Sequence, residues 1–90
     1  MPTVHLIIKG KVQGVFFRAS ARDQARNIGV TGWVKNTAEG NVEAVVSGEE
    51  NKVRSFIEWC RKGPDEAVVT NVDIIKSTEE EFKDFKIVRG

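Results

Sequence analysis

Apolar and polar positions alternate along the chain with two periods, one typical of strands and one typical of helices. From Val4 to Val12, apolar residues fall mainly on every second position, which predicts a strand with one face buried and the other exposed. Ala19–Ile28 instead has apolar residues at helical spacing and is followed by Gly29, which predicts an amphipathic helix that stops at this glycine. We therefore expect a strand and then a helix.

The middle of the chain predicts a hairpin and a second helix. Thr31–Asn36 and Val42–Val46 alternate as two strands, and the connection between them contains Gly40, which can take the positive φ of a tight turn. Ser47 and Glu50 then have the spacing of a helix capping box. The clearest helical stripe follows, with apolar side chains at positions i, i+3, i+4 and i+7, namely Val53, Phe56, Ile57 and Cys60.

The last third of the chain predicts shorter elements separated by polar segments. The second helix is expected to stop at Gly63 and Pro64. The elements expected after it are an irregular connection over Asp65–Val69, a strand over Asn71–Lys76 with Val72 and Ile74 inward, a polar surface turn over Thr78–Lys83 that includes Glu79–Glu81, and a short edge strand over Phe85–Ile87.

These elements follow one another in the order β-α-β-β-α-β, with a short fifth strand at the end. Two amphipathic helices, expected over residues 18–29 and 49–62, cover the sheet most economically when both lie on one face. The order therefore predicts an α+β, ferredoxin-like sandwich with an antiparallel sheet. Ninety residues suffice for one such domain, which we expect to span residues 1–90.

Charge and composition exclude several classes of partner. The chain has 14 Lys and Arg against 13 Asp and Glu, a net charge of +1, which gives no electrostatic footprint for nucleic acid or a membrane surface. No apolar run has the length of a membrane span, and no signal-peptide pattern is present. The single cysteine cannot form an internal disulfide. We expect a cytoplasmic monomer without nucleic-acid or membrane partners.

The turn between the first strand and the first helix, Lys11–Arg18, is the main candidate for chemistry. A strand-to-helix turn exposes several backbone N–H groups near the positive end of the helix dipole, and Gly14 lets the backbone approach a ligand. Arg18 adds a planar fork of donors that matches a phosphate or carboxylate. The turn is therefore a candidate anion-binding cradle, and a tight turn with a solvated arginine explains it equally well.

Asn36 is expected near this cradle although it is distant in sequence. In a strand-helix-strand unit both strands run in the same direction, so the turn after Val12 and the residue Asn36 lie at the same end of the sheet. The amide of Asn36 has a donor and an acceptor and can orient a water molecule. The alternative is that Asn36 only begins the hairpin turn, a common position for asparagine.

Other reactive side chains do not suggest a second site. His5 is expected on the outer face of the first strand, and Cys60 lies on the core stripe as an inert thiol. Trp33 and Trp59 are interpreted as packing residues. No second Cys or His stands at metal-ligand spacing, so we expect no metal site.

The motifs around the turn and the second strand resemble those of the acylphosphatase family. They are Val12–Arg18, Gly29–Asn36 and Gly40–Glu43, and the similarity extends over nearly the whole chain. Glu39 departs from the pattern, because the hairpin of this family often has aspartate before the glycine, and this touches turn geometry rather than chemistry.

This resemblance implies a hydrolase that uses no metal or cofactor and cleaves the carboxyl-phosphate bond of small acyl phosphates to a carboxylate and inorganic phosphate. It implies that Arg18 and Asn36 are the catalytic residues, with Asn36 positioning the water. The implied phosphate-binding residues are Gln13, Gly14, Val15, Phe16, Phe17 and Arg18.

Two other functions share part of this pattern. RNA-binding modules have the same order of elements, but they stack bases on aromatic residues of their central strands, and Val42–Val46 contains none. A domain that binds phosphate without turning over a substrate is the second alternative. The presence of both Arg18 and Asn36 argues against it.

Overall fold

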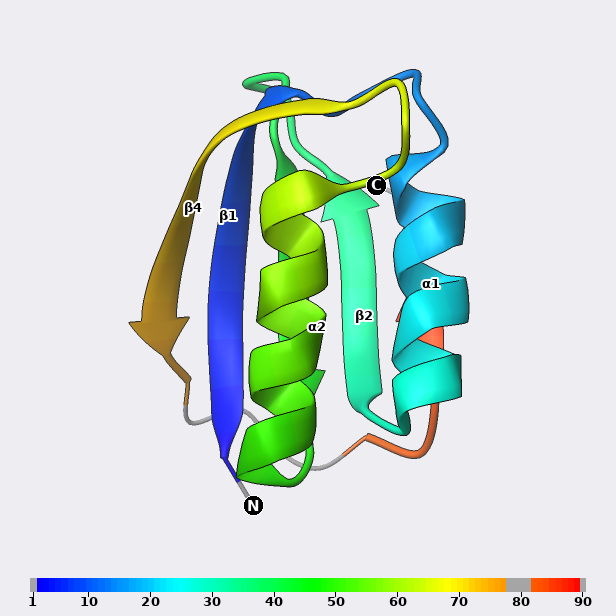
Figure 1. The fold of residues 1–90 in the computed structure, drawn as a ribbon, viewed down its shortest axis with the longest axis vertical. Helices are drawn as coiled ribbons and strands as arrows, with labels where there is room; N and C mark the ends of the chain where they lie inside the picture. The colour runs from blue at the N-terminus through cyan, green and yellow to red at the C-terminus, as the bar shows by residue number, and fades with distance from the viewer. Residues whose placement is uncertain (1, 78–81, 90) are drawn as a thin grey trace.

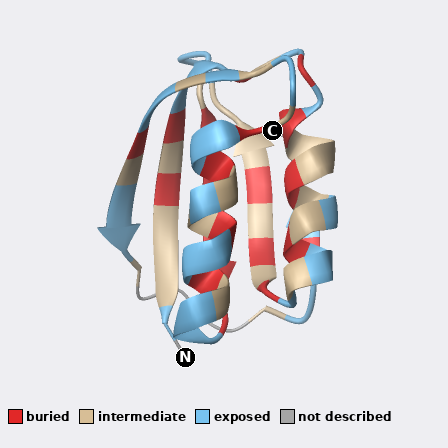
Figure 2. Cartoon of the chain, in the orientation of Figure 1, coloured by how far each residue is buried: buried red, intermediate tan, exposed pale blue. Residues whose placement is uncertain are grey.

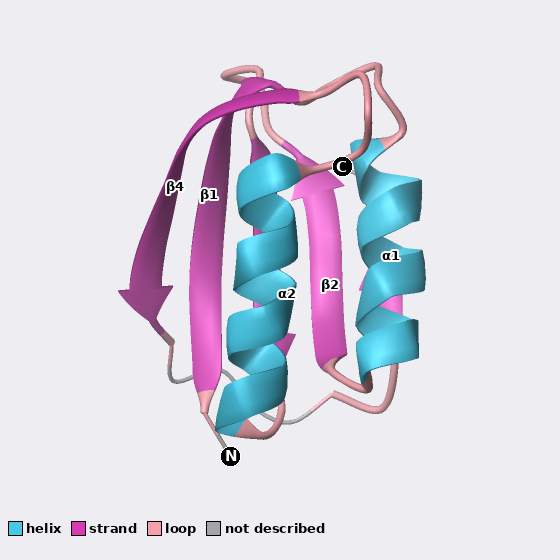
Figure 3. Ribbon diagram, viewed as in Figure 1, coloured by secondary structure: helices cyan, strands magenta, loops and turns pink. Residues whose placement is uncertain are grey.

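Two helices lie side by side on one face of a five-stranded sheet (Figure 1; Figure 3). The computed structural model describes residues 2–77 and 82–89. Its elements are β1 (Thr3–Lys11), α1 (Phe17–Ile28), β2 (Thr31–Asn36), β3 (Val42–Ser47), α2 (Glu50–Lys62), β4 (Val68–Lys76) and β5 (Phe85–Ile87). Both predicted helices are confirmed to within a residue at each end.

The strands are arranged in the order β4-β1-β3-β2-β5, which confirms the ferredoxin-like α+β prediction. The pairs β1–β3, β1–β4 and β2–β3 are antiparallel, but β2 and β5 are parallel, so the expected antiparallel sheet is corrected to a mixed one. The reason is topological. β4 ends at the end of the sheet where β2 begins, and β5 starts from that same end on the opposite edge.

The core lies between the sheet and the helices, where the buried residues of both layers face each other (Figure 2). Phe17 of α1, Phe56 of α2 and Phe85 of β5 are all fully buried. The rings of Phe56 and Phe85 lie 5.4 Å apart, and those of Phe17 and Trp59 lie 5.3 Å apart. This aromatic group therefore joins both helices to the edge strand β5, and Trp59 is a packing residue as predicted.

The expected capping box at the start of α2 is wrong. Ser47 is the last residue of β3, and its hydroxyl accepts a hydrogen bond from Thr3 of β1 at 2.9 Å. The N-cap position is Glu49 instead, and among the described residues no side chain caps this helix. The Ser47 hydroxyl, which the capping box would use, is instead hydrogen-bonded to a residue of another strand that is distant in sequence.

The fourth strand also differs from the prediction. β4 begins at Val68, so residues expected in an irregular connection pair with β1 as far as Lys11, across a register shift at Gly10. Val72 is buried as expected. Ile74 pairs with the buried Leu6 and so lies on the helix side of the sheet, but 46% of it is exposed, because β4 is an edge strand that curves away from α2 (Figure 1).

The edge position of β5 is confirmed. The predicted polar turn over Thr78–Lys83 lies largely outside the described residues, and the acidic run within it lies wholly outside them. Neither of the described helices has the length and apolar character needed to cross a membrane.

Candidate active site

The loop that joins β1 to α1 reverses direction through two left-handed residues. Gly14 has φ 75°, and Phe16 has φ 63° and ψ 25°. Phe16 is the only non-glycine residue with a positive φ in the described part of the chain, and a bulky residue adopts this conformation only where its surroundings impose it. Val15 and Phe17, on either side, are buried and hold the loop to the core.

This conformation leaves the start of α1 free to bind an anion. Phe16 is the N-cap residue, and no side chain in the described part of the chain caps the helix. The first helical bond runs from the Ser20 N–H to the Phe16 carbonyl at 3.0 Å, so the N–H groups of Phe17, Arg18 and Ala19 have no carbonyl partner within the helix. They lie at the positive end of the helix dipole.

Gln13 connects this loop to the β2–β3 hairpin. Its side-chain amide donates to the carbonyl oxygens of Thr37 and Asn41, each at 2.8 Å. Sequence reasoning placed Gln13 among the phosphate-binding residues without assigning this contact. Since its amide is engaged by the hairpin, only its backbone N–H is available to a ligand.

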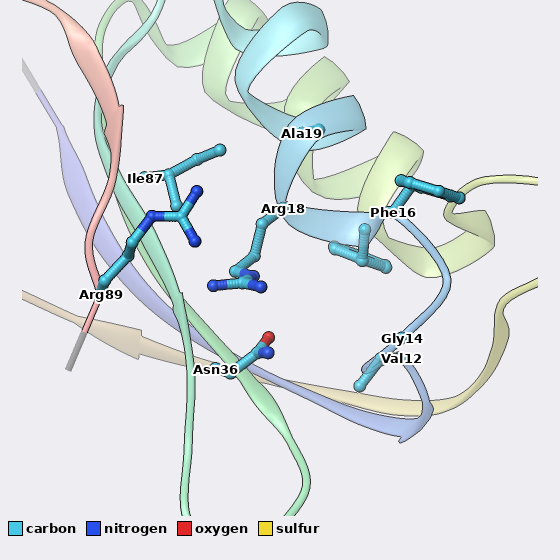
Figure 4. A pocket seen from close by; sticks show the side chains of 9 residues that line it. Val12, Gly14, Phe16, Arg18, Ala19, Asn36, Ile87 and Arg89 are labelled. Atoms are coloured by element: carbon cyan, nitrogen blue, oxygen red, sulfur yellow. The ribbon is translucent and has the colours of Figure 1, made fainter.

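Asn36 lies at the end of β2, close to the loop. β1 and β2 are both antiparallel to β3, so they are parallel to each other and end at the same side of the sheet. The hairpin is closed by Thr37, whose N–H donates to the Asn41 carbonyl at 2.9 Å and whose hydroxyl accepts from the Asn41 N–H at 3.1 Å. Asn36 is therefore not needed for the turn, and its side chain faces the pocket (Figure 4).

These segments enclose a pocket of about 320 Å³ (Figure 4). It is lined by Val12, Gly14, Phe16, Phe17, Arg18, Ala19, Asn36, Ile87 and Arg89. The structure thus brings together Arg18 and Asn36, the two predicted catalytic residues, with most of the predicted loop. Val15 and Gln13 are not part of the lining.

Sequence reasoning missed Ile87 and Arg89. They reach the pocket because β5 pairs with β2 in parallel, with Ile87 opposite Val34. If the chain continues in the same direction, the residue two positions after Ile87, which is Arg89, lies beside the residue two positions after Val34, which is Asn36. Arg89 could have been placed at the pocket if the sequence had indicated that the last strand pairs in parallel with the second. A strand of three residues is too short for its apolar pattern to specify a partner.

The pocket is positively charged although the whole chain is nearly neutral. Among the described residues, Arg18 and Arg89 are the only charged ones that line it, and none of the lining residues carries a side-chain carboxylate. Within the described residues neither arginine forms a salt bridge, whereas Arg26 is paired with Asp84 at 3.0 Å and Arg61 with Glu58 at 3.2 Å. The two guanidinium groups are therefore available to an anionic ligand.

The histidine and the cysteine lie away from this pocket and have structural surroundings of their own. His5 contacts Glu43 at 2.5 Å on the face of the sheet away from the helices, as expected for an outer-face residue. Cys60 is fully buried, and this burial raises the pKa of its thiol far above the ordinary range, as expected for an inert thiol. In residues 2–77 and 82–89, no group of His, Cys, Asp and Glu side chains could hold a metal ion.

Fold and pocket together define a class of protein, a small α+β domain whose β1–α1 loop, uncapped helix start and two guanidinium groups meet in one pocket at one end of its sheet. A family model described as acylphosphatase matches residues 4–87. The chain therefore belongs to the acylphosphatase family, a family of acid-anhydride hydrolases.

Individual relatives agree with this assignment. The acylphosphatase of Syntrophus aciditrophicus is 48% identical over 89 residues, which cover 98% of this chain and 93% of that protein. The crystal structure of acylphosphatase from Bacillus subtilis matches with a TM-score of 0.93 and 36% identity, over 98% of this chain and 99% of that one. An acylphosphatase structure from Coxiella burnetii matches with a TM-score of 0.92 and 41% identity, over 97% and 92% of the two chains.

Proposed function

We propose that this protein hydrolyses the carboxyl-phosphate bond of acyl phosphates and releases a carboxylate and inorganic phosphate. The observation that supports it most is the convergence of three features on one pocket: the unpaired N–H groups at the start of α1, the Arg18 guanidinium and the Asn36 amide. Phosphoryl transfer depends mainly on positioning and on stabilising charge, and these groups supply both.

In this proposal the phosphoryl group occupies the cradle formed by Gln13–Arg18. Backbone N–H groups of the loop and the Arg18 guanidinium donate to its oxygens, and Gln13 takes part through its backbone because its amide is bonded to the hairpin. The donors are already held in place by the buried residues beside them, so little reorganisation accompanies the reaction.

The reaction needs few further groups. A water molecule oriented by the Asn36 amide attacks phosphorus, its oxygen forms the new bond, and the bond to the carboxylate oxygen breaks with its electron pair. The leaving carboxylate has a conjugate acid pKa of about 4, so it departs without a general acid. Asn36 is neutral and cannot act as a base, and the water proton passes to a phosphoryl oxygen of the substrate.

Attack at phosphorus rather than at the carbonyl carbon follows from where the donors lie. The loop and Arg18 line the same pocket as Asn36 (Figure 4), and their N–H donors suit the oxygens of a phosphoryl group. No Ser/His or Cys/His pair lines the described part of the pocket, so a covalent acyl intermediate has no nucleophile.

The proposal also covers the size of the substrate, the oligomeric state of the protein and its location. We propose a small-molecule acyl phosphate as substrate, a single domain over residues 1–90, a monomer, and a cytoplasmic location. The modest volume of the pocket, about 320 Å³, and the near-neutral charge of +1 support a small ligand over a nucleic acid or a membrane.

Hydrolysis of benzoyl phosphate in ¹⁸O-labelled water tests the proposal. We expect the purified protein to release phosphate, with the label in phosphate and none in benzoate, and with no slowing by a chelator. Absence of turnover despite measurable phosphate binding would make the protein an anion sensor. Label in benzoate would mean that water attacks the carbonyl carbon and that the cradle only anchors the substrate.

A further inference from the structure

The pocket has a wall that the phosphate-binding loop does not form. It is made by Ile87 of β5 and by Arg89 just beyond that strand, and it faces the loop residues Gly14 and Phe16 across the pocket (Figure 4). The Arg89 side chain extends from this wall toward Arg18 (Figure 4).

Several contacts fix the position of this wall. Phe85 is fully buried, and the backbone of β5 is bonded to β2 at both ends, with the Gly32 N–H donating to the Asp84 carbonyl at 3.0 Å and the Val88 N–H donating to the Val34 carbonyl at 2.8 Å. Asp84 is also paired with Arg26 of α1 at 3.0 Å. The residue that precedes Arg89 is therefore anchored to the sheet.

The pocket carries two positive charges, whereas the phosphoryl group is proposed to use only one of them, that of Arg18. Two guanidinium groups without salt-bridge partners in the described residues face the same pocket, and no side-chain carboxylate is among the described residues that line it. Like charges held near each other disfavour the empty site, and a second anionic group on the ligand would relieve this. The volume of about 320 Å³ lies at the small end of the range for organic ligands, about 300–1,000 Å³, so the pocket has room for more than a phosphoryl group.

We propose that Arg89 binds an anionic group on the acyl portion of the substrate, so that the enzyme favours acyl phosphates whose acyl group has a second negative charge. This inference rests on the proposed function. With the phosphoryl group held between the loop and Arg18, the acyl portion extends toward the opposite wall. There Ile87 contacts its carbon atoms and Arg89 pairs with its distal anion, preferably a carboxylate that accepts two hydrogen bonds.

The test compares benzoyl phosphate with its 3-carboxy and 4-carboxy derivatives, which differ only in the added charge and its position. The readout is the ratio of kcat/KM for a carboxylated substrate to kcat/KM for benzoyl phosphate, measured for the wild type, Arg89→Gln and Arg89→Lys. For at least one isomer we expect Arg89→Gln to lower this ratio about 3- to 10-fold, the range of a partly exposed charged contact. Arg89→Lys should retain part of it, and the wild-type preference should weaken as salt is added.

Arg22→Gln is the matched control, because Arg22 lies on α1 with its own partner, Asp23, at 3.3 Å and is not part of the pocket lining. It should leave the ratio unchanged. An unchanged ratio in Arg89→Gln for both isomers would overturn the proposal. So would an equal loss for all substrates together with weaker inhibition by inorganic phosphate, because Arg89 would then bind the phosphoryl group. No turnover of any substrate by the wild type would instead refute the proposed function.

Discussion

Arg18 is half-buried and lines the pocket beside the N–H groups of its own helical turn. Its side chain has no hydrogen-bond or salt-bridge partner among the described residues, so no contact in that part of the fold uses its charge. A side chain of this kind can contact the phosphoryl group both in the bound substrate and in the transition state. Its removal should therefore affect binding and turnover together.

Arg18→Ala should lower kcat/KM for benzoyl phosphate by about 10³- to 10⁵-fold, as for other charge-stabilising arginines in phosphoryl transfer, and should weaken competitive inhibition by phosphate. Arg18→Lys should restore little, because an ammonium group lacks the bidentate fork. Steady-state kinetics with phosphate as inhibitor measures both effects, and Arg22→Ala on the same helix is the control. A lysine variant close to wild type would show that charge alone is needed.

Asn36→Ala should separate turnover from binding. If the Asn36 amide orients only the water, kcat should fall by about 10²- to 10³-fold, the loss typical of one preorganised hydrogen-bonding group, while the inhibition constant for phosphate changes little. An equal loss of phosphate affinity would make Asn36 a ground-state ligand. Loss of the folded state in a thermal melt would mean that Asn36 is needed for the hairpin. That result would be unexpected, because hydrogen bonds of Thr37 close this turn.

At the residue scale, the sequence was enough to predict that Arg18 and Asn36 lie close together, because their positions follow from simple geometry. A strand-helix-strand unit brings both to the same end of the sheet, whatever else the chain does. Arg89 was not predicted at the site, because its position depends on the pairing of the three-residue strand β5 with β2, which is distant in sequence. Gln13 was predicted, but the sequence alone could not show that its amide would bond to the hairpin.

At the scale of elements, the contact between the loop and the β2–β3 hairpin is the feature that couples the two halves of the site. One amide group joins the backbone before Gly14 to two carbonyl oxygens of the hairpin that follows Asn36. The loop proposed to bind phosphate and the residue proposed to position the water, Asn36, are thereby held at a fixed separation. A change in this single link should alter the site without touching any group proposed to contact the substrate through its side chain.

Gln13→Ala should cost about 1–3 kcal/mol of unfolding free energy, because two neutral hydrogen bonds are lost and each contributes about 0.5–1.5 kcal/mol. It should also lower kcat and weaken phosphate inhibition together, since the loop loses its support. Urea unfolding and steady-state kinetics measure the two effects. Gln24→Ala on α1 is the control, a half-buried glutamine outside the site. Full activity in Gln13→Ala would show that the buried neighbours Val15 and Phe17 position the loop unaided.

At this scale, local patterns were enough to predict the helices, because an apolar stripe must be buried against a sheet whatever the order of the strands in it. Val53, Phe56 and Cys60 are buried as the stripe required. The capping box at Ser47 failed because Thr3, distant in sequence, uses the same hydroxyl. The start of β4 was missed because its first residues are exposed at a sheet edge, where apolar alternation is weak and pairing with β1 decides the structure.

At the scale of the whole molecule, the site is assembled from the β1–α1 loop, the start of α1, the end of β2, and β5 with the segment after it, which come from both ends of the chain. Each of these elements is held by the one core, through Phe17, Val34 and Phe85. A ligand that bridges the loop to Arg18 therefore binds the folded state and has no counterpart in the unfolded chain. Binding and global stability should be linked.

Inorganic phosphate should accordingly stabilise the fold. At a concentration about 100 times its dissociation constant, phosphate should add about 2.7 kcal/mol, which corresponds to a rise in Tm on the order of 10 °C for a domain of this size. Thermal melts in phosphate and in sodium chloride of equal ionic strength separate binding from screening. The rise should largely vanish in Arg18→Ala and persist in Asn36→Ala, because, of these two side chains, only that of Arg18 is proposed to contact the phosphoryl group before water attacks. A full rise in Arg18→Ala would mean that the N–H groups of the loop and of the helix start hold phosphate by themselves. The guanidinium would then serve the transition state alone.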